Sequence, residues 1–208
     1  MRHYCDYFLL LSPNEHVDQQ VQRHKQYAAN IIGNFKSEHS KAHISLKQMH
    51  RQKAFISEPL LESLKTGLQT LPPINLTIDG FDYFNHGNDY RTIYASLRSD
   101  HITTHWFKML KKHLTIKDFM VPHITICRNI PISDFEKLWP HFKAINWVEH
   151  FTVNELTILQ RESLDTFSKW QPYLTLPFEA RRLHQPNPPK TPKIKPDLRL
   201  QTGQMKLF

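Results

Sequence analysis

Cysteine is scarce in this sequence, which has only Cys5 and Cys127 among its 208 residues. Each lies in an apolar run typical of a strand, so we interpret both as small buried hydrophobic residues and exclude a disulfide framework. Such sparse use of cysteine is typical of a reducing compartment.

Long apolar runs are also missing. A helix that spans a membrane needs about 20 consecutive apolar residues, and no stretch approaches that length. The apolar run over 7–11 is too short for the core of a secretory signal, and it directly follows Asp6. We therefore expect a cytoplasmic protein with no membrane partner, and by default a monomer.

Acidic residues are outnumbered, with 19 Asp and Glu against 27 Lys and Arg, for a net charge of +8. A basic balance is compatible with RNA or DNA, although many proteins without such partners are basic. Residues 179–208 hold seven Lys and Arg against Glu179 and Asp197, so they supply +5 of the +8 and leave about +3 for the rest. This proline-rich segment predicts a flexible basic tail after a domain over 1–178.

Two short strings of the same form stand out in what is present. AHISL occupies 42–46, and PHITI occupies 122–126, about 80 residues later. Alternate side chains of a strand share a face, so His43 and Ser45 point one way, as do His123 and Thr125. If the two strands lie side by side, two imidazoles and two hydroxyls face one groove. Such a set suits acid–base chemistry on a phosphodiester.

The surroundings of the two strings also repeat. Each follows a predicted strand and a predicted helix, so the strand over 4–11 corresponds to that over 91–98. A repeated supersecondary unit indicates a pseudo-twofold arrangement, with one helix on the back of each unit's sheet. The two motif strands would then meet between two α/β lobes.

Further elements follow from periodicity and punctuation. Capping boxes at Ser12 and Ser133 predict two helix starts, and Pro140 predicts a kink or an early end in the second of these helices. We expect a basic loop over 47–53. The remaining predicted elements are a strand pair over 74–84 and 91–98, helices over 57–71 and 100–114, a motif strand over 119–130, and a closing strand pair over 151–160 and 170–178.

The pattern resembles the two-histidine (2H) phosphoesterase superfamily and, within it, the bacterial 2′-5′ RNA ligase-like cyclic phosphodiesterases. Two His-x-Ser/Thr motifs carry the resemblance, and the string over 122–128 ends in an arginine as the family's second motif does. The segment over 154–159, followed by Tyr173 and Pro177, also resembles the family, so the similarity covers about 4–178. The chain departs from the family after the first motif, where Lys47 and Gln48 replace residues that are often apolar or small.

This resemblance implies an α+β fold of two pseudo-twofold lobes, with antiparallel sheets lining a central cleft and helices on the outer faces. It also implies an enzyme that opens a 2′,3′-cyclic phosphate on RNA or a nucleotide to a 2′-phosphate, with 2′-5′ ligation as the reverse reaction. His43 and His123 are the expected acid and base, in an order that the sequence does not assign. Ser45 and Thr125 would donate hydrogen bonds to the phosphate oxygens.

Three further residues are candidates for substrate binding. Arg128 carries over from the family's second motif, but in an ideal strand it points away from His123, so it reaches the site only if the strand bulges or ends. In a regular strand Lys47 lies on the same face as His43, so it would contact phosphate, unless its amine is simply solvated. Tyr94 alternates toward the polar side of its strand, where it would stack on a base, unless it packs in the core.

No cofactor is expected, because two imidazoles can supply both proton transfers. Neither motif has a neighbouring cluster of carboxylates, and zinc binding by His43 and His123 would lack the usual Cys or carboxylate partners.

Two interpretations of another class remain open. The terminal QMKLF at Gln204–Phe208 resembles the Gln-x-x-Leu-Phe peptide that docks bacterial proteins on the replication sliding clamp, although a tail can end this way by chance. The domain could also bind RNA as a scaffold without turnover.

Overall fold

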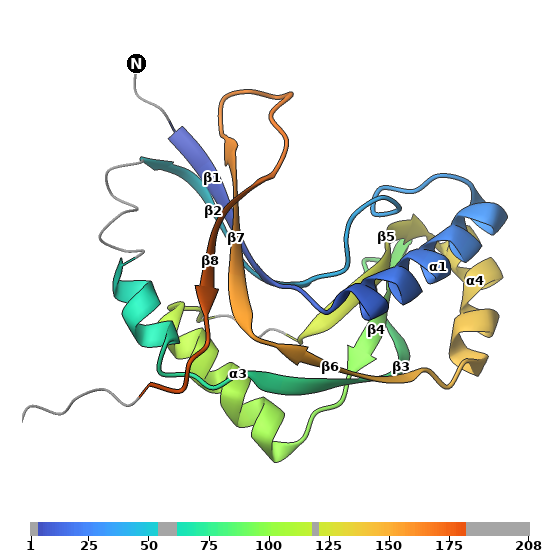
Figure 1. The fold of residues 1–208 in the computed structure, drawn as a ribbon. Coiled ribbons are helices and arrows are strands. Elements are labelled where there is room, and N and C mark those ends of the chain that lie inside the picture. The colour runs from blue at the N-terminus through green and yellow to red at the C-terminus, as the bar shows by residue number, and fades with distance from the viewer. Residues whose placement is uncertain (1–3, 54–61, 118–120, 182–208) are drawn as a thin grey trace, which may run out of the picture.

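The computed structural model describes residues 4–53, 62–117 and 121–181, which form an α+β fold around one antiparallel sheet of eight strands (Figure 1). The strand order is β6-β3-β4-β5-β2-β1-β7-β8. The strands are β1 Tyr4–Leu11, β2 Ile44–Lys53, β3 Ile74–His86, β4 Tyr90–Leu97, β5 His123–Pro131, β6 Val148–Val153, β7 Glu155–Glu162 and β8 Gln171–Pro177. The helices are α1 Glu15–Ile32, α3 His101–His113 and α4 Ile132–Ala144, and residues 62–68 are also helical.

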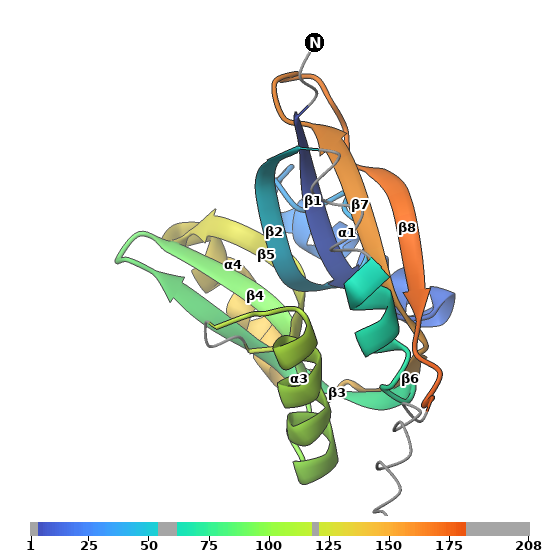
Figure 2. The same ribbon diagram turned by 90° about the vertical axis from the view of Figure 1, so that its left-hand side faces the viewer.

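The strand order confirms the repeat expected from the sequence. The motif strands β2 and β5 are central, β1 and β4 lie outside them, and β7 and β3 follow in turn. The first strands of the two units, β1 and β4, thus lie at the same distance from the centre, as do the motif strands β2 and β5. In Figure 2, β4 and β5 run obliquely to β1 and β2, so the sheet bends where the two halves meet.

One helix is not placed as the repeat predicts. Helix α1 follows β1 in the chain, yet it packs against β5 and α4 of the other half, and Figure 1 shows α1 beside α4. Its inward residues Val17, Val21 and Ala28 are fully buried, as expected from their spacing of three to four. The first unit therefore covers the sheet of the second.

The helix starts differ from the predicted capping boxes. Asn14, not Ser12, caps α1, with its side-chain oxygen accepting a hydrogen bond from the Val17 amide at 3.0 Å. Helix α4 begins at Ile132 after Pro131 with no side-chain cap, so Ser133 lies inside the helix. Pro140 does not end it, because the helix continues to Ala144.

Two other predictions are wrong at the level of strands. The predicted basic loop over 47–53 is the second half of β2, since it pairs with β1 as far as Lys53. The predicted strand over 151–160 is two strands, β6 and β7, which meet at Asn154 and lie in opposite halves of the sheet. Periodicity alone does not reveal this break, because both pieces alternate as strands do.

The core lies behind the motif strands. Ile44 and Ile124 are fully buried, and Cys5 and Cys127 are buried free thiols, as predicted. Burying an aliphatic side chain of this size contributes about 1.5–3 kcal/mol. The motif strands therefore have one face fixed by packing.

The described chain continues past Phe178, with the amides of Ala180 and Arg181 donating hydrogen bonds to Leu71 and Gln69. Residues 182–208, including Gln204–Phe208, lie outside the described part. Among the helices of the described part, none combines the length and apolar character that crossing a membrane requires.

Candidate active site

The two motif strands meet at one rung of the sheet, where Ile44 of β2 pairs antiparallel with Ile124 of β5. Extending this register by one residue sets His43 opposite Thr125 and Ser45 opposite His123. Since the two isoleucines point into the core, these four side chains share the other face. The structure thus brings both imidazoles and both hydroxyls together, each histidine across from the other motif's hydroxyl.

The two imidazoles are oriented in the same way. His43 Nδ1 lies 2.8 Å from the Lys41 carbonyl oxygen, and His123 Nδ1 lies 2.7 Å from the Val121 carbonyl oxygen. A carbonyl oxygen only accepts, so Nδ1 carries the hydrogen in each ring. The lone pair of the neutral ring is therefore on Nε2, which is the atom available for proton transfer.

Burial lowers the pKa of His43 below the ordinary histidine value. The hydrogen bond to Lys41 opposes this shift, while the positive charges of Lys25, His123 and Arg128 add to it. Burial also lowers the pKa of His123, again with a contribution from Arg128. Both rings are thus held toward the neutral form, and they are near enough for the charge of His123 to act on His43.

Helix α1 holds the segment that leads into His43. The amine of the fully buried Lys25 donates hydrogen bonds to the Ser37 carbonyl oxygen at 2.9 Å and to the Ser40 carbonyl oxygen at 2.5 Å. Asp18 accepts a hydrogen bond from the Ala42 amide at 2.6 Å. Burial lowers the pKa of Lys25 to about 8, so its amine is still mostly protonated at neutral pH. The first imidazole is therefore positioned by buried groups and not by a free loop.

A bulge in β5 brings Arg128 to the histidine face. Tyr94 pairs with Thr125 and Ile93 pairs with Cys127, so β5 has one extra residue between them. Ile126 and Cys127 both point into the core, which turns Arg128 to the face of His123. From the sequence, Arg128 was expected to reach the site only if its strand bulged or ended, and this bulge is present. The charge of Arg128 lowers the pKa of both histidines, which agrees with that position.

The corresponding bulge in β2 has the opposite effect on Lys47. Leu10 pairs with Ser45 and Leu9 pairs with Lys47, so the extra residue lies directly after Ser45. Lys47 thereby turns to the back of the sheet, where its amine donates a hydrogen bond to the Leu114 carbonyl oxygen at 3.0 Å. The structure does not bring Lys47 to the four motif side chains.

Gln48 takes the place predicted for Lys47. It pairs with Phe8, whose ring lies 5.4 Å from the His43 ring, so Gln48 is on the histidine face. Its position after the β2 bulge matches that of Arg128 after the β5 bulge. Sequence reasoning noted Gln48 only as a departure from the family, because a bulge leaves no signal in simple alternation.

Aromatic rings flank both imidazoles. Tyr94 and Phe84 stack at 4.2 Å, and each ring lies 5.0 Å from the His123 ring. Tyr94 is only 4% exposed and donates a hydrogen bond to Asp82, and burial raises its pKa to about 12. In this structure Tyr94 therefore packs beside His123. Neither Phe8 nor Phe84 was identified from the sequence, since nothing local distinguishes them from core residues.

Two cavities are lined by residues other than the four motif side chains. One of about 700 Å³ runs along α3 and reaches Val121 and Pro122, directly before His123. The other, of about 470 Å³, lies at the β7–β8 hairpin. Among the described residues, no group of three or more His, Cys, Asp and Glu is placed to hold a metal ion.

The sequence matches the family described as the 2′-5′ RNA ligase superfamily over residues 13–165, which is more than half of the chain. No curated protein matches it.

Solved structures share the fold at low sequence identity. TT0787 of Thermus thermophilus is 14% identical with a TM-score of 0.58, over 84% of this chain and 98% of that one. E. coli LigT complexed with 3′-AMP is also 14% identical, with a TM-score of 0.56 over the same shares. E. coli LigT complexed with phosphate is 13% identical with a TM-score of 0.53, over 85% of this chain and 98% of that one. These similarities establish the fold.

Proposed function

Because the chain belongs to the 2′-5′ RNA ligase superfamily, we propose that it is a phosphodiesterase that opens 2′,3′-cyclic phosphates by paired-histidine catalysis. The observation that carries this proposal is the pairing of the motif strands, which sets His43, Ser45, His123 and Thr125 on one face. Two imidazoles with free Nε2 atoms and two hydroxyl donors match the needs of this reaction.

One imidazole acts as a base and the other as an acid. A neutral ring takes a proton through Nε2 from water as the water oxygen forms a bond to phosphorus. The bond between phosphorus and the ribose 3′ oxygen breaks, and the other ring, as imidazolium, gives its Nε2 proton to that oxygen. The product is a 2′-phosphate, and both proton transfers are made by groups of the chain.

The other groups of the site stabilise charge on the phosphate. The hydroxyls of Ser45 and Thr125 donate to the non-bridging oxygens, where charge is redistributed in the transition state. Arg128 supplies a positive charge on the same face. With an RNA 5′-hydroxyl in place of water as the attacking group on the cyclic phosphate, the same arrangement gives 2′-5′ ligation.

The family and the fold relatives support a nucleotide or RNA substrate. E. coli LigT has been crystallised with 3′-AMP and with phosphate, which are a nucleotide and the anion that the hydroxyls would contact. The proposed substrate is therefore a nucleotide or an RNA end that carries a 2′,3′-cyclic phosphate.

The test is hydrolysis of 2′,3′-cyclic AMP by the wild type and by His43→Ala and His123→Ala, with and without a chelator. We expect turnover that resists the chelator and falls at least ~100-fold in each variant, the lower end for a missing acid or base. Exposed His39→Ala serves as a matched control and should retain full activity. Full activity in either motif variant would refute the paired roles.

A further inference from the structure

The surroundings of the two histidines differ in a way that bears on the substrate. Beside His123, the rings of Phe84 and Tyr94 stack on each other, and the Tyr94 hydroxyl donates a hydrogen bond to Asp82. Beside His43, the aromatic contacts continue outward: the ring of Phe8 lies 5.7 Å from that of Trp170, which is only half-buried. Phe84 and Trp170 are both partly exposed, but the rings beside His123 adjoin the acidic Asp82, whereas those beside His43 lead to Trp170.

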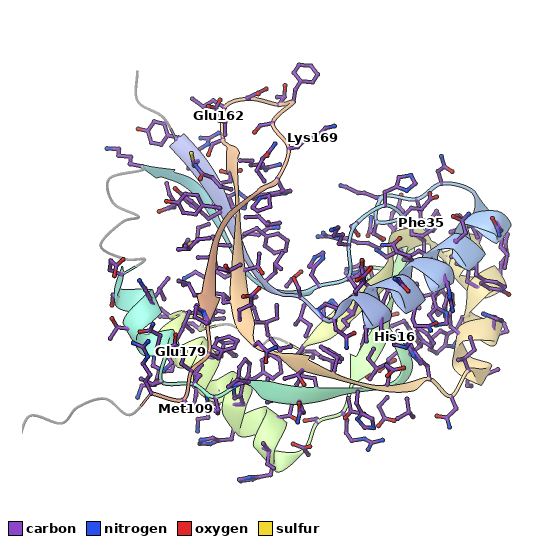
Figure 3. All side chains as sticks on the ribbon, in the orientation of Figure 1. His16, Phe35, Met109, Glu162, Lys169 and Glu179 are labelled. Atoms are coloured by element: carbon purple, nitrogen blue, oxygen red, sulfur yellow. The ribbon has the colours of Figure 1, made fainter. Side chains whose placement is uncertain are left out.

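Positively charged side chains lie beside Trp170, on the His43 side of the site. The Arg161 guanidinium lies 4.6 Å over the Trp170 ring. Arg161 also lines the cavity of about 470 Å³ at the β7–β8 hairpin, together with Lys169 and the 89% exposed Phe167. Figure 3 shows Lys169 on the returning arm of the hairpin, with its side chain pointing away from the strands. Aromatic rings interleaved with cations are typical of surfaces that bind single-stranded nucleic acid.

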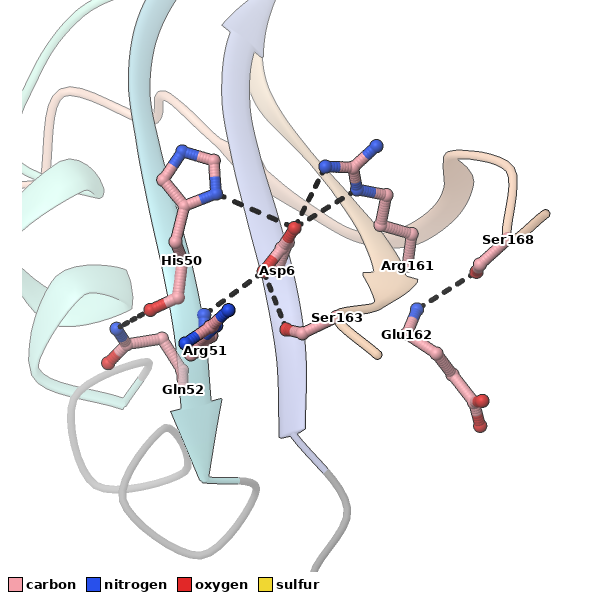
Figure 4. A network of polar contacts seen from close by, with 8 residues as sticks. All are labelled: Asp6, His50, Arg51, Gln52, Arg161, Glu162, Ser163 and Ser168. Atoms are coloured by element: carbon pink, nitrogen blue, oxygen red, sulfur yellow. Dashed lines mark hydrogen bonds and ion pairs between the residues drawn. The ribbon is translucent and has the colours of Figure 1, made fainter. Parts of the chain in front are cut away.

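Arg161 is held in place by a buried carboxylate (Figure 4). Asp6 accepts hydrogen bonds from Arg161 at 2.9 and 3.1 Å, from the Ser163 hydroxyl at 2.5 Å and from the Arg51 amide at 3.0 Å. Burial alone would raise the pKa of Asp6, but these hydrogen bonds lower it well below the ordinary value. Asp6 therefore stays ionised and fixes the base of the hairpin before any ligand arrives.

We infer that this surface, from Phe8 through Trp170 and Arg161 to Lys169, is a subsite for the nucleotide next to the cyclic phosphate of an RNA substrate. The inference rests on the proposed function. A 2′,3′-cyclic phosphate ends an RNA strand at its 3′ side, so any further nucleotide lies on the 5′ side. Its base stacks on Trp170, and its phosphate lies near Arg161 and Lys169. The preferred substrate is then an RNA end and not a mononucleotide.

The test compares kcat/KM for 2′,3′-cyclic AMP with kcat/KM for an adenosine dinucleotide that ends in a cyclic phosphate. We expect the wild type to prefer the dinucleotide, and Trp170→Ala to lower kcat/KM for the dinucleotide about 5- to 100-fold, as expected for one stacked base, with little effect on the mononucleotide. Trp170→Phe should restore most of the loss. Lys169→Ala should weaken use of the dinucleotide at low salt and less at high salt.

Two control variants separate the subsite from general effects. Leu164→Ala removes a 71% exposed apolar side chain from the same hairpin, and Lys65→Ala removes an exposed charge elsewhere. Both should behave as the wild type. Equal kcat/KM for both substrates in the wild type, or an equal loss on both substrates in Trp170→Ala, would overturn the inference while leaving the proposed function intact.

Absence of turnover on either substrate would instead contradict the proposed function. The subsite is then tested by binding of a fluorescently labelled single-stranded RNA pentamer with a 3′-phosphate. Weaker binding by Trp170→Ala than by Leu164→Ala supports the subsite, and equal affinity for the two variants overturns it.

Discussion

At the level of single residues, the symmetry of the site is broken at one pair of positions. Arg128 and Gln48 stand after equivalent bulges on the histidine face, so one half presents a guanidinium where the other presents a neutral amide. Only Arg128 can supply charge to a phosphate from this position. The positive charge of Arg128 also lowers the pKa of both His43 and His123.

This charge predicts a pH effect. Since burial and Arg128 lower the pKa of both imidazoles, the profile of kcat/KM against pH should have its optimum below the ordinary histidine value of ~6.5. Removing the charge in Arg128→Gln should raise the pKa of both imidazoles and move both limbs of the profile to higher pH. We also expect kcat/KM at the optimum to fall about 10-fold or more, for the loss of a hydrogen bond from a charged donor.

The limbs belong to the interacting histidine pair and not to one ring, so their joint movement is the quantity to measure. Arg23→Gln removes an exposed arginine on α1 and should leave the profile in place. A profile that stays fixed in Arg128→Gln would mean that the guanidinium does not act on the pair.

At the level of elements, the bulges in β2 and β5 decide which side chains reach the site. If side chains alternated strictly, Lys47 would lie on the same face of the sheet as His43, and Arg128 would lie on the opposite face from His123. One extra residue in each strand reverses both assignments. Binary patterning predicted the pairing of the two motif strands and the shared face of the four motif side chains, but it could not locate the bulges, which depend on how each strand pairs with its neighbour.

This reversal predicts different results for the lysine variant Lys47→Met and the arginine variant Arg128→Gln. Lys47→Met removes a hydrogen bond to Leu114 on the back of the sheet, so it should lower the free energy of unfolding by about 1 kcal/mol. Its kcat/KM on a cyclic nucleotide should stay within about threefold of the wild type, unlike that of Arg128→Gln. Denaturant unfolding and steady-state kinetics on the same samples measure both effects. A loss of activity in Lys47→Met as large as in Arg128→Gln would place the lysine at the phosphate.

At the level of the whole molecule, the two halves are joined by more than the Ile44–Ile124 rung. Helix α1 of the first half packs on β5 of the second, and Asn154 connects β6, the edge strand of one half, to β7, which lies next to the edge strand β8 of the other. The repeat of strand, helix and motif was sufficient to predict the central position of β2 and β5. The placement of α1 and the break at Asn154 were not predictable, because local pattern does not show which half a helix or strand will join.

These connections predict that the halves unfold as one cooperative unit. In urea, far-UV circular dichroism and tryptophan fluorescence should report the same midpoint. Ile124→Ala, which opens a cavity at the central rung, should lower the free energy of unfolding by about 2–5 kcal/mol and move both transitions together. Two separate transitions would show that the halves are independent.

The crossing of α1 has a consequence for either half taken alone. Without the second half, α1 would expose the side chains of Val17, Val21 and Ala28 to water, and without the first half β5 would lose the helix that packs on it. A fragment holding one imidazole should therefore not fold as a stable separate domain.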